Sequence, residues 1–318
     1  MHETKEIHHR MSQKTELEVA GRKLLVSNLE KVLYPQAGFT KSQVIDYYIR
    51  IAPVLLPHLK KRPITMKRYP DGVEGFFFYE KQCPPHRPDW VKTARVSASR
   101  EEGYIDYCVI DDLPALVWAA NLADLELHPF LHRAPALSRP TALAFDLDPG
   151  PPADIALCCQ VGLWLKEIFD ALGLESFPKT SGSKGLQIFV PLNTPVTYAK
   201  TKALARALAE RLEKEHPKEV VSRMMKSLRP GKVLIDWSQN DEHKTTICVY
   251  SLRAKAAPTV STPVTWDEVE GGSKGKKTGR LSFESEAVAR RVEAHGDLFA
   301  PVLTLKQKLP KFELPDES

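Results

Sequence analysis

Two aspartates separated by one residue end a short apolar stretch, residues 141–150 (TALAFDLDPG). In a β-strand, side chains alternate, so Asp146 and Asp148 would share one face while Leu147 points into the core. Neighbouring carboxylates repel each other, and either a retained proton or a cation relieves the repulsion. Carboxylate oxygens suit Mg²⁺ or Mn²⁺. The pattern favours a metal site, with a solvated acidic turn as the alternative.

Two further segments could complete such a site. Residues 232–240 (KVLIDWSQN) predict a second apolar strand that delivers Asp236, and residues 181–190 (SGSKGLQIFV) predict a Gly/Ser/Lys turn that leads into another strand. Three acids can hold two cations, and the N–H groups of the turn together with Lys184 can hold a triphosphate. The combination predicts a nucleotidyl-transfer site. Without the flanking aspartates, a tight turn with a solvated lysine explains the same residues.

The elements that must position these residues alternate between strands and helices. A capping box, Thr40 with Gln43, predicts a helix that Pro53 ends or kinks. Asp154 is predicted to open another helix, with an apolar stripe on its inner side. Further helices are predicted at 113–122, 197–215 and 284–295. Strands are predicted at 64–68, 76–80, 91–97, 104–110, 124–131, 176–180, 186–191 and 245–250, and a hairpin at 17–26.

Strands predominate and helices interleave, which indicates the α+β class. Residues 1–16 are polar and predict a disordered leader, residues 17–305 a single domain, and residues 306–318 a loose tail. The 318 residues are 42% hydrophobic and 27% charged, enough to bury a sizeable core. The net charge of +5 is compatible with a polyanionic partner.

The five cysteines form no C-x-x-C pair, so neither a zinc site nor a disulfide framework is predicted, and reduced thiols are expected. The sequence has no run of about 18 apolar residues and no signal-peptide core. We therefore expect a soluble, intracellular protein with no membrane partner.

Many motifs, in order, resemble one known family: SNLEKVLYP, TKSQVIDYY, KRPITMKRYPDGV, FFYEKQ, FDLDPG, SGSKGL, KSLRPGK, VLIDWSQN, KTTI and YSLR. Over residues 24–300 the chain resembles the polymerase domain of bacterial end-joining ligases of the ligase D type, in the archaeo-eukaryotic primase superfamily. The resemblance implies two packed β-sheets with flanking helices, and a primase-like catalytic core whose sheet is like that of the RNA-recognition motif.

The resemblance also implies roles for particular residues. Asp146, Asp148 and Asp236 would be the catalytic metal ligands. The implied nucleotide-binding residues are Lys67, His128, Ser181, Ser183, Lys184, Gln187, Gln239 and Arg253. At Gln187 the chain departs from the family, which has a histidine that contacts the incoming nucleotide's phosphates. Glutamine can donate a hydrogen bond but carries no charge. The substitution therefore bears on the catalytic rate and not on the class of reaction.

Contacts with DNA are implied at two places. Lys31 and Lys41, the latter just after the predicted helix cap, would hold a 5′-phosphate, because a helix N-terminus attracts anions. Phe78 and Tyr79 would stack on the template. The alternatives are exposed lysines and aromatic core packing. His128 is either a core histidine or, as the resemblance implies, faces the nucleotide sugar.

The resemblance implies a primase-polymerase that binds DNA gaps, nicks and double-strand-break ends. It would add nucleotides, preferentially ribonucleotides, to a 3′-hydroxyl during non-homologous end joining, with two Mn²⁺ or Mg²⁺ ions. Nucleoside triphosphates would be substrates, and Ku and a DNA ligase partners, in the nucleoid-associated cytoplasm of a prokaryote. The alternatives are a de novo primase and a non-catalytic DNA-end-binding module.

Overall fold

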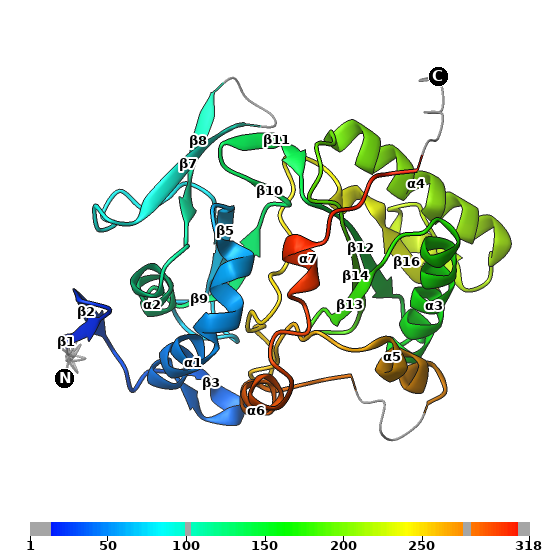
Figure 1. Cartoon of the computed structure of the whole chain (residues 1–318). Coiled ribbons are helices and arrows are strands. Elements are labelled where there is room, and N and C mark those ends of the chain that lie inside the picture. The colour runs from blue at the N-terminus through cyan, green and yellow to red at the C-terminus, as the bar shows by residue number, and fades with distance from the viewer. Residues whose placement is uncertain (1–13, 99–102, 276–280, 311–318) are drawn as a thin grey trace, which may run out of the picture.

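The structure is a computed structural model that describes residues 14–98, 103–275 and 281–310 (Figure 1). Two five-stranded sheets with flanking helices confirm the predicted α+β class. The sheet that carries the aspartates, here the aspartate sheet, has the order β13-β14-β12-β16-β15. The second sheet has the order β6-β5-β8-β7, with β9 also paired to β5.

The strands of the aspartate sheet are β12 (Ala142–Pro149), β13 (Phe177–Thr180), β14 (Leu186–Pro191), β15 (Val220–Val221) and β16 (Val233–Asp236). Those of the second sheet are β5 (Pro63–Arg68), β6 (Phe78–Glu80), β7 (Lys92–Ser97), β8 (Tyr104–Val109) and β9 (Asp124–Pro129). Two-stranded pairs are β1 (Lys14–Val19) with β2 (Arg22–Ser27), β3 (Val32–Tyr34) with β4 (Phe39–Thr40), and β10 (His132–Arg133) with β11 (Ala136–Pro140). The helices are α1 (Lys41–Leu59), α2 (Leu113–Asn121), α3 (Ile155–Ala171), α4 (Tyr198–Glu215), α5 (Trp266–Ser273), α6 (Ser285–His295) and α7 (Pro301–Thr304).

Strand alternation in β12 determines which way the aspartates face. Leu143, Phe145 and Leu147 are fully buried in a core shared with α3 and α4. Ala142 and Ala144 belong to the other core, on the opposite side of the strand. Side chains two residues apart share a face, so Asp146 and Asp148 continue the alanine side, away from the helices. The predicted orientation of Leu147 is confirmed.

Helix α1 begins as predicted but ends later. The Thr40–Gln43 capping box is present, with the Thr40 backbone N–H donating to Gln43 Oε1 at 2.8 Å. The sequence predicts that Pro53 ends or kinks the helix. Pro53 does not end it, because α1 continues through Pro53 to Leu59. Leu55 and Leu59 are fully buried, and this packing offsets the backbone hydrogen bonds that proline cannot donate.

Residues 245–250 are not the strand that the pattern predicts. Thr245 makes an isolated bridge to Phe130, and only scattered hydrogen bonds join the segment to β9, such as Cys248 N to Leu127 O at 2.9 Å. Tyr250 has φ 64°, which takes the backbone out of the extended conformation. The segment connects the two sheets without a ladder. Residues 261–279, whose Gly- and Ser-rich sequence predicts a loop, contain helix α5, and residues 276–280 lie outside the described residues.

The expectation that all cysteines are reduced was wrong for one pair. Cys83 and Cys108 form a disulfide with their Cα atoms 4.9 Å apart, although 25 residues separate them in sequence. The Cys83 backbone N–H donates to Asp106 O at 2.7 Å, so the segment after β6 lies along β8. Tertiary proximity, which the spacing of the cysteines does not reveal, brings them together.

At both ends, ordered residues extend into the ranges predicted as a disordered leader and a loose tail. Strand β1 begins at Lys14, inside the range predicted as leader, and residues 1–13 lie outside the described residues. Gln307, in the range predicted as a loose tail, bonds Glu175 and Pro191 through its side chain and Leu192 through its backbone. Residues 311–318 lie outside the described residues.

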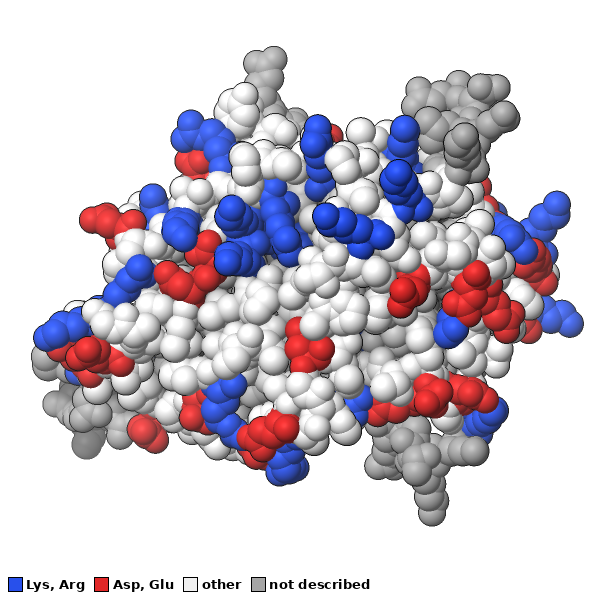
Figure 2. All heavy atoms as spheres, in the orientation of Figure 1, with Lys and Arg blue, Asp and Glu red and all other residues white. Residues whose placement is uncertain are grey.

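Surface charge is unevenly distributed. On the face seen in Figure 2, Lys and Arg side chains gather in the upper half, where Figure 1 places β10 and β11. Asp and Glu side chains predominate below and to the right. Within the described ranges, no helix combines the length and apolar character needed to cross a membrane.

Candidate active site

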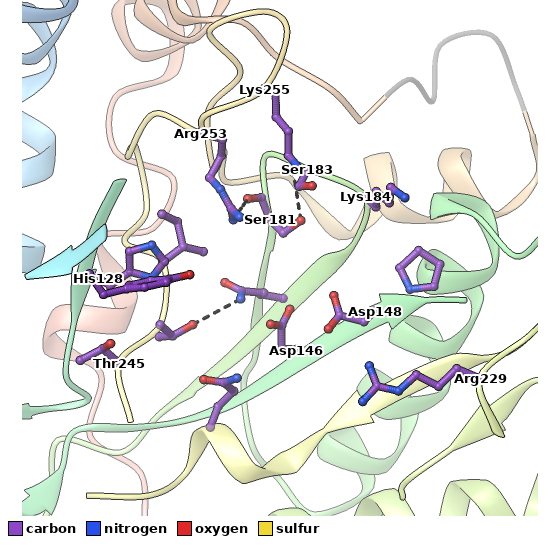
Figure 3. A pocket seen from close by; sticks show the side chains of 16 residues that line it. His128, Asp146, Asp148, Ser181, Ser183, Lys184, Arg229, Thr245, Arg253 and Lys255 are labelled. Carbon is purple, nitrogen blue, oxygen red and sulfur yellow. Dashed lines mark hydrogen bonds between the residues drawn. The ribbon is translucent and has the colours of Figure 1, made fainter. Parts of the chain in front are cut away.

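Four residues form a row across the aspartate sheet. Lys179 of β13 pairs with Gln187 of β14, Gln187 with Asp146 of β12, and Asp146 with Asp236 of β16. Beside this row lies a cavity of about 540 Å³ (Figure 3). Its lining includes Asp146, Gln187 and many of the other predicted nucleotide-binding residues, namely His128, Ser181, Ser183, Lys184, Gln239 and Arg253. The antiparallel registers therefore bring together residues from distant parts of the sequence.

Asp146 and Asp148 lie side by side at the cavity floor (Figure 3). Burial and the neighbouring charge of Asp148 raise the pKa of Asp146 to about 7. Burial and the charge of Asp236 also raise the pKa of Asp148. Oδ1 of Asp146 is buried without a hydrogen-bond partner. The pair thus combines two acids of raised pKa with a buried carboxylate oxygen that has no donor.

Asp236 faces the pair but is engaged elsewhere. Its Oδ1 accepts a hydrogen bond from the Ser238 backbone N–H at 2.9 Å, and its Oδ2 accepts one from Gln239 Nε2 at 2.9 Å. The carboxylate therefore caps the short 3-10 helix at Trp237–Gln239. In this conformation Asp236 adds negative charge near the site, but both of its carboxylate oxygens already accept hydrogen bonds.

The donor chemistry fits a divalent cation at the Asp146–Asp148 pair. Hard carboxylate oxygens are the ligands that Mg²⁺ and Mn²⁺ prefer, and the buried, partnerless Oδ1 of Asp146 is satisfied by such an ion. In the part of the chain that the structure describes, no three His, Cys, Asp or Glu side chains converge closely enough to enclose one metal ion. Asp236 would have to leave its cap to join the pair.

The Ser181–Lys184 turn forms the cavity wall beside the aspartates. Ser181 Oγ accepts hydrogen bonds from the backbone N–H groups of Ser183 at 3.2 Å and Gly185 at 3.1 Å. A Cβ atom at Gly185 would lie 2.1 Å from the backbone oxygen of Leu147, so only glycine lets the turn approach β12 so closely. The sequence of the turn therefore places Ser181, Ser183 and Lys184 next to the acids.

Cations surround the cavity (Figure 3). Arg253 donates to Ser181 O at 2.7 Å, which ties the segment after Tyr250 to the turn. Arg229 and Lys255, which were not predicted, also line the cavity. The charge of Arg229 acts on Asp148 and lowers its pKa. The Arg229 backbone passes so close to Gly150 that a Cβ atom there would lie 2.1 Å from Arg229 O. Carboxylates beneath a cationic rim match a polyphosphate with bound cations.

Gln187, at which the chain departs from the family pattern, is hydrogen-bonded to a buried lysine, Lys179. Lys179 Nζ donates to Gln187 Oε1 and, at 2.7 Å, to Ser261 Oγ. Gln187 Nε2 in turn donates to Thr246 Oγ1 at 3.3 Å. Burial lowers the pKa of Lys179 to about 7. The neutral amide of Gln187 is thus held in place by Lys179, a residue to which the sequence motifs assign no role.

A second cluster lies on the neighbouring sheet. Lys67 Nζ lies 4.7 Å from the ring centroid of Phe77 and 5.2 Å from that of Tyr79. His128 forms an edge-to-face pair with Tyr79, their ring centroids 6.2 Å apart. Both Lys67 and His128 contact the buried carboxylate of Glu126, which was also not predicted. Tyr79 and His128 line the cavity, so this cluster forms its second wall.

The predicted stacking pair is divided between two faces of β6. Tyr79 is 56% exposed and lines the cavity. Phe78 is half-buried and packs with Arg68, whose guanidinium lies 5.2 Å from the ring centroid. Alternation along the strand separates the two residues. Phe77, 45% exposed, shares the Lys67 contact with Tyr79.

Lys31 and Lys41, the two residues of the predicted anion pocket, lie close together at the start of α1. The Lys41 backbone N–H donates to Lys31 O at 2.9 Å, and Lys41 Nζ donates to Ser27 O at 2.7 Å. Burial and the charge of Lys31 lower the pKa of Lys41 to about 8. Lys31 itself pairs with Asp71 at 2.9 Å.

The sequence motifs assign no role to four of the residues at or behind this site: Glu126, Lys179, Arg229 and Lys255. Charged residues within strand patterns were a usable signal for Glu126 and Lys179, because a charge predicted to be buried needs a partner. Arg229 and Lys255 lie in loops, where a charged residue is unremarkable in sequence.

An α+β domain with paired carboxylates beside a basic serine–glycine turn is typical of the class that handles nucleoside polyphosphates. The chain belongs to the family of the LigD primase-polymerase domain, whose match covers residues 40–299. It is 41% identical over 283 residues to the multifunctional non-homologous end joining protein LigD of Mycolicibacterium smegmatis. It is 34% identical over 250 residues to the bifunctional non-homologous end joining protein LigD of Bacillus subtilis.

These alignments cover 87% and 78% of this chain but 36% and 40% of the two relatives, so the chain spans well under half of their length. Among solved structures, the chain is similar to the polymerase domain of Mycobacterium tuberculosis ligase D in complex with DNA. The TM-score is 0.82 at 39% identity, and the match covers 89% of this chain and 99% of that one. The predicted resemblance is confirmed, and with it a place in a family of DNA repair by non-homologous end joining.

Proposed function

We propose that this chain is a primase-polymerase that adds nucleotides to a 3′-hydroxyl at DNA gaps, nicks and double-strand-break ends. The observation that carries the proposal is the partnerless, buried carboxylate oxygen of Asp146, next to Asp148 and beneath the basic Ser181–Lys184 turn. Family membership and the DNA-bound relative support the same reaction class.

We assign Asp146, Asp148 and Asp236 to two divalent cations, Mn²⁺ or Mg²⁺. Bound cations would neutralise the triphosphate and favour ionisation of the attacking hydroxyl. The protein's own groups then orient the substrate. The Lys184 ammonium and the Arg253 guanidinium would bind phosphate oxygens, and Arg253 also holds the turn through Ser181 O.

The opposite wall would receive the base and sugar. Tyr79 offers an exposed ring for stacking, and Lys67 keeps that aromatic surface cationic. His128 lines the cavity and would meet the sugar, and we propose a preference for ribonucleotides on that basis. Gln187 and Gln239 supply neutral hydrogen-bond donors beside the acids.

Other parts of the assignment concern partners. Lys31 and Lys41 would hold a 5′-phosphate at the far side of a gap. Ku and a DNA ligase are proposed partners because the relatives' names describe multifunctional end-joining proteins. Work at chromosomal breaks would place the protein at the nucleoid, in the cytoplasm.

The decisive experiment is extension of a gapped duplex with each ribonucleotide and deoxyribonucleotide under Mg²⁺ and under Mn²⁺. We expect template-directed addition that requires a divalent ion and favours ribonucleotides. Primer-free synthesis of dinucleotides would instead indicate a de novo primase. Binding of DNA ends without any incorporation would indicate a non-catalytic module.

A further inference from the structure

Glu126 connects three of the residues assigned to the nucleotide, although it does not itself line the cavity. It lies on β9, 1% exposed, directly opposite Lys67 of β5. Glu126 Oε2 lies 3.0 Å from His128 Nε2 and 3.6 Å from Lys67 Nζ. Oε1 lies 3.3 Å from Arg253 Nε and accepts a hydrogen bond from the Ala254 backbone N–H at 3.0 Å.

These contacts determine the protonation state of Glu126. Burial opposes ionisation, but the hydrogen bond from His128 and the charges of Arg253 and Lys67 hold the pKa of Glu126 well below its ordinary value. A carboxylate in this state can only accept hydrogen bonds. The 3.0 Å contact therefore requires that His128 carry a proton on Nε2.

The remaining ring nitrogen of His128 is then defined as well. Burial is the largest influence on the pKa of His128 and lowers it. The hydrogen bond to Glu126 and the charge of Glu126 raise this pKa, and the charges of Arg253 and Lys67 lower it. The net direction is downward, which favours the neutral ring. A neutral ring with its proton on Nε2 has a lone pair on Nδ1. No hydrogen bond from any residue within the described ranges reaches Nδ1. The ring lines the cavity, and Nδ1 is its remaining acceptor.

We propose that Glu126 is a positioning residue that selects for ribonucleotides by locking His128 in the tautomer whose Nδ1 accepts a hydrogen bond from the 2′-hydroxyl. A deoxyribonucleotide lacks that donor and leaves Nδ1 unpaired. The same carboxylate also forms ion pairs with Lys67 and Arg253. Glu126 therefore contacts residues of both the proposed sugar site and the proposed phosphate site. This inference rests on the proposed function, because that function supplies the nucleotide substrate. The tautomer of His128 follows from the contacts of Glu126 alone.

The kinetic test is Glu126→Gln, which keeps the shape of the side chain and removes its charge. The amide can donate to Nε2, which allows the proton to move to Nδ1. We expect the ratio of ribonucleotide to deoxyribonucleotide kcat/KM to fall by about tenfold, the worth of one hydrogen bond. Glu80→Gln is the matched control, because Glu80 pairs with Arg68 at 2.7 Å on the same sheet without lining the cavity, and it should leave the ratio unchanged.

A double-mutant cycle shows whether Glu126 acts through His128. In a His128→Ala background, Glu126→Gln should change the ratio no further. An equal loss for both nucleotide types in Glu126→Gln, with an unchanged ratio, would reduce Glu126 to a structural role. Glu126→Asp, which retains the charge, should preserve most of the preference.

The tautomer can be measured without any activity. Nitrogen-15 correlation spectra of the histidine rings, with His128 assigned by its loss in His128→Ala, should show a neutral ring protonated on Nε2 in the wild type. A wild-type ring protonated on Nδ1, or doubly protonated at pH 7.5, would overturn the inference even if the enzyme is active. If Glu126→Gln fails to fold, the wild-type spectrum still decides. An inactive wild type would defeat the proposed function alone.

Discussion

Lys179 donates a hydrogen bond to Gln187 from the neighbouring strand, directly behind the position where Gln187 pairs with Asp146. The glutamine that replaces the family histidine is therefore part of a buried hydrogen-bonded chain that runs from Lys179 to Thr246. Its amide is oriented by the fold, so the site retains a fixed donor where the family carries an imidazole.

This arrangement predicts the effect of Lys179→Met, which keeps the bulk of the side chain but leaves Gln187 Oε1 without its donor. We expect kcat/KM for nucleotide addition to fall by about tenfold, with DNA affinity unchanged, because one oriented hydrogen bond is lost. Single-turnover extension and anisotropy measure the two quantities. Lys166→Met, at an exposed ion pair on α3, is the control. Activity within twofold of wild type would show that Gln187 does not depend on Lys179.

The acidic pair predicts metal dependence that can be read without catalysis. Mn²⁺ should raise the thermal midpoint of the wild type, because binding to the folded state stabilises it, and should have no effect on Asp146→Asn. The same substitution, and Asp236→Asn, should reduce incorporation to background while DNA binding stays within about threefold, since backbone contacts with DNA do not involve the acids. Metal-dependent extension by Asp236→Asn would remove that residue from the site.

The 5′-phosphate pocket predicts a pH-dependent affinity. The Lys41 pKa of about 8 means that its positive charge is lost as the pH rises through 8. The advantage of a phosphorylated over an unphosphorylated gap should therefore shrink between pH 7 and pH 9, at fixed salt, by anisotropy. Lys41→Arg, which stays charged, should abolish the pH dependence. A phosphate effect that survives the Lys31→Ala, Lys41→Ala double substitution would rule the pocket out.

The burial of Asp124 on β9 predicts how the stability of the protein depends on pH. Both of its carboxylate oxygens are buried without a partner, and burial raises its pKa well above the ordinary value. With the folded pKa above the unfolded one, stability is lost as the pH rises past the unfolded pKa of about 4. Asp124→Asn should therefore stabilise the protein by about 1–3 kcal/mol at pH 7, and the gain should vanish below about pH 4. Chemical denaturation at several pH values provides the measurement, and a destabilised variant at pH 7 would contradict the argument.

The sequence alone determined the local elements and the acidic motif. Alternation in residues 141–150 was enough to place Asp146 and Asp148 on one face, because a strand's side-chain period is a local property. The Thr40 capping box likewise predicted the start of α1 within its own four residues. The motifs, which occur in the same order as in the family, gave the family assignment. The similarity to LigD proteins confirmed it.

Tertiary structure decided what local patterns cannot encode. The strand registers placed Lys179, Gln187 and Asp236 in one row with Asp146, and nothing within any single segment specifies its partner in a sheet. The disulfide at Cys83 and the role of Glu126 depend on the same long-range pairing. In the sequence, a charge within a strand pattern indicates only that Glu126 needs a partner. The fold shows which partners it has, namely Lys67, His128 and Arg253.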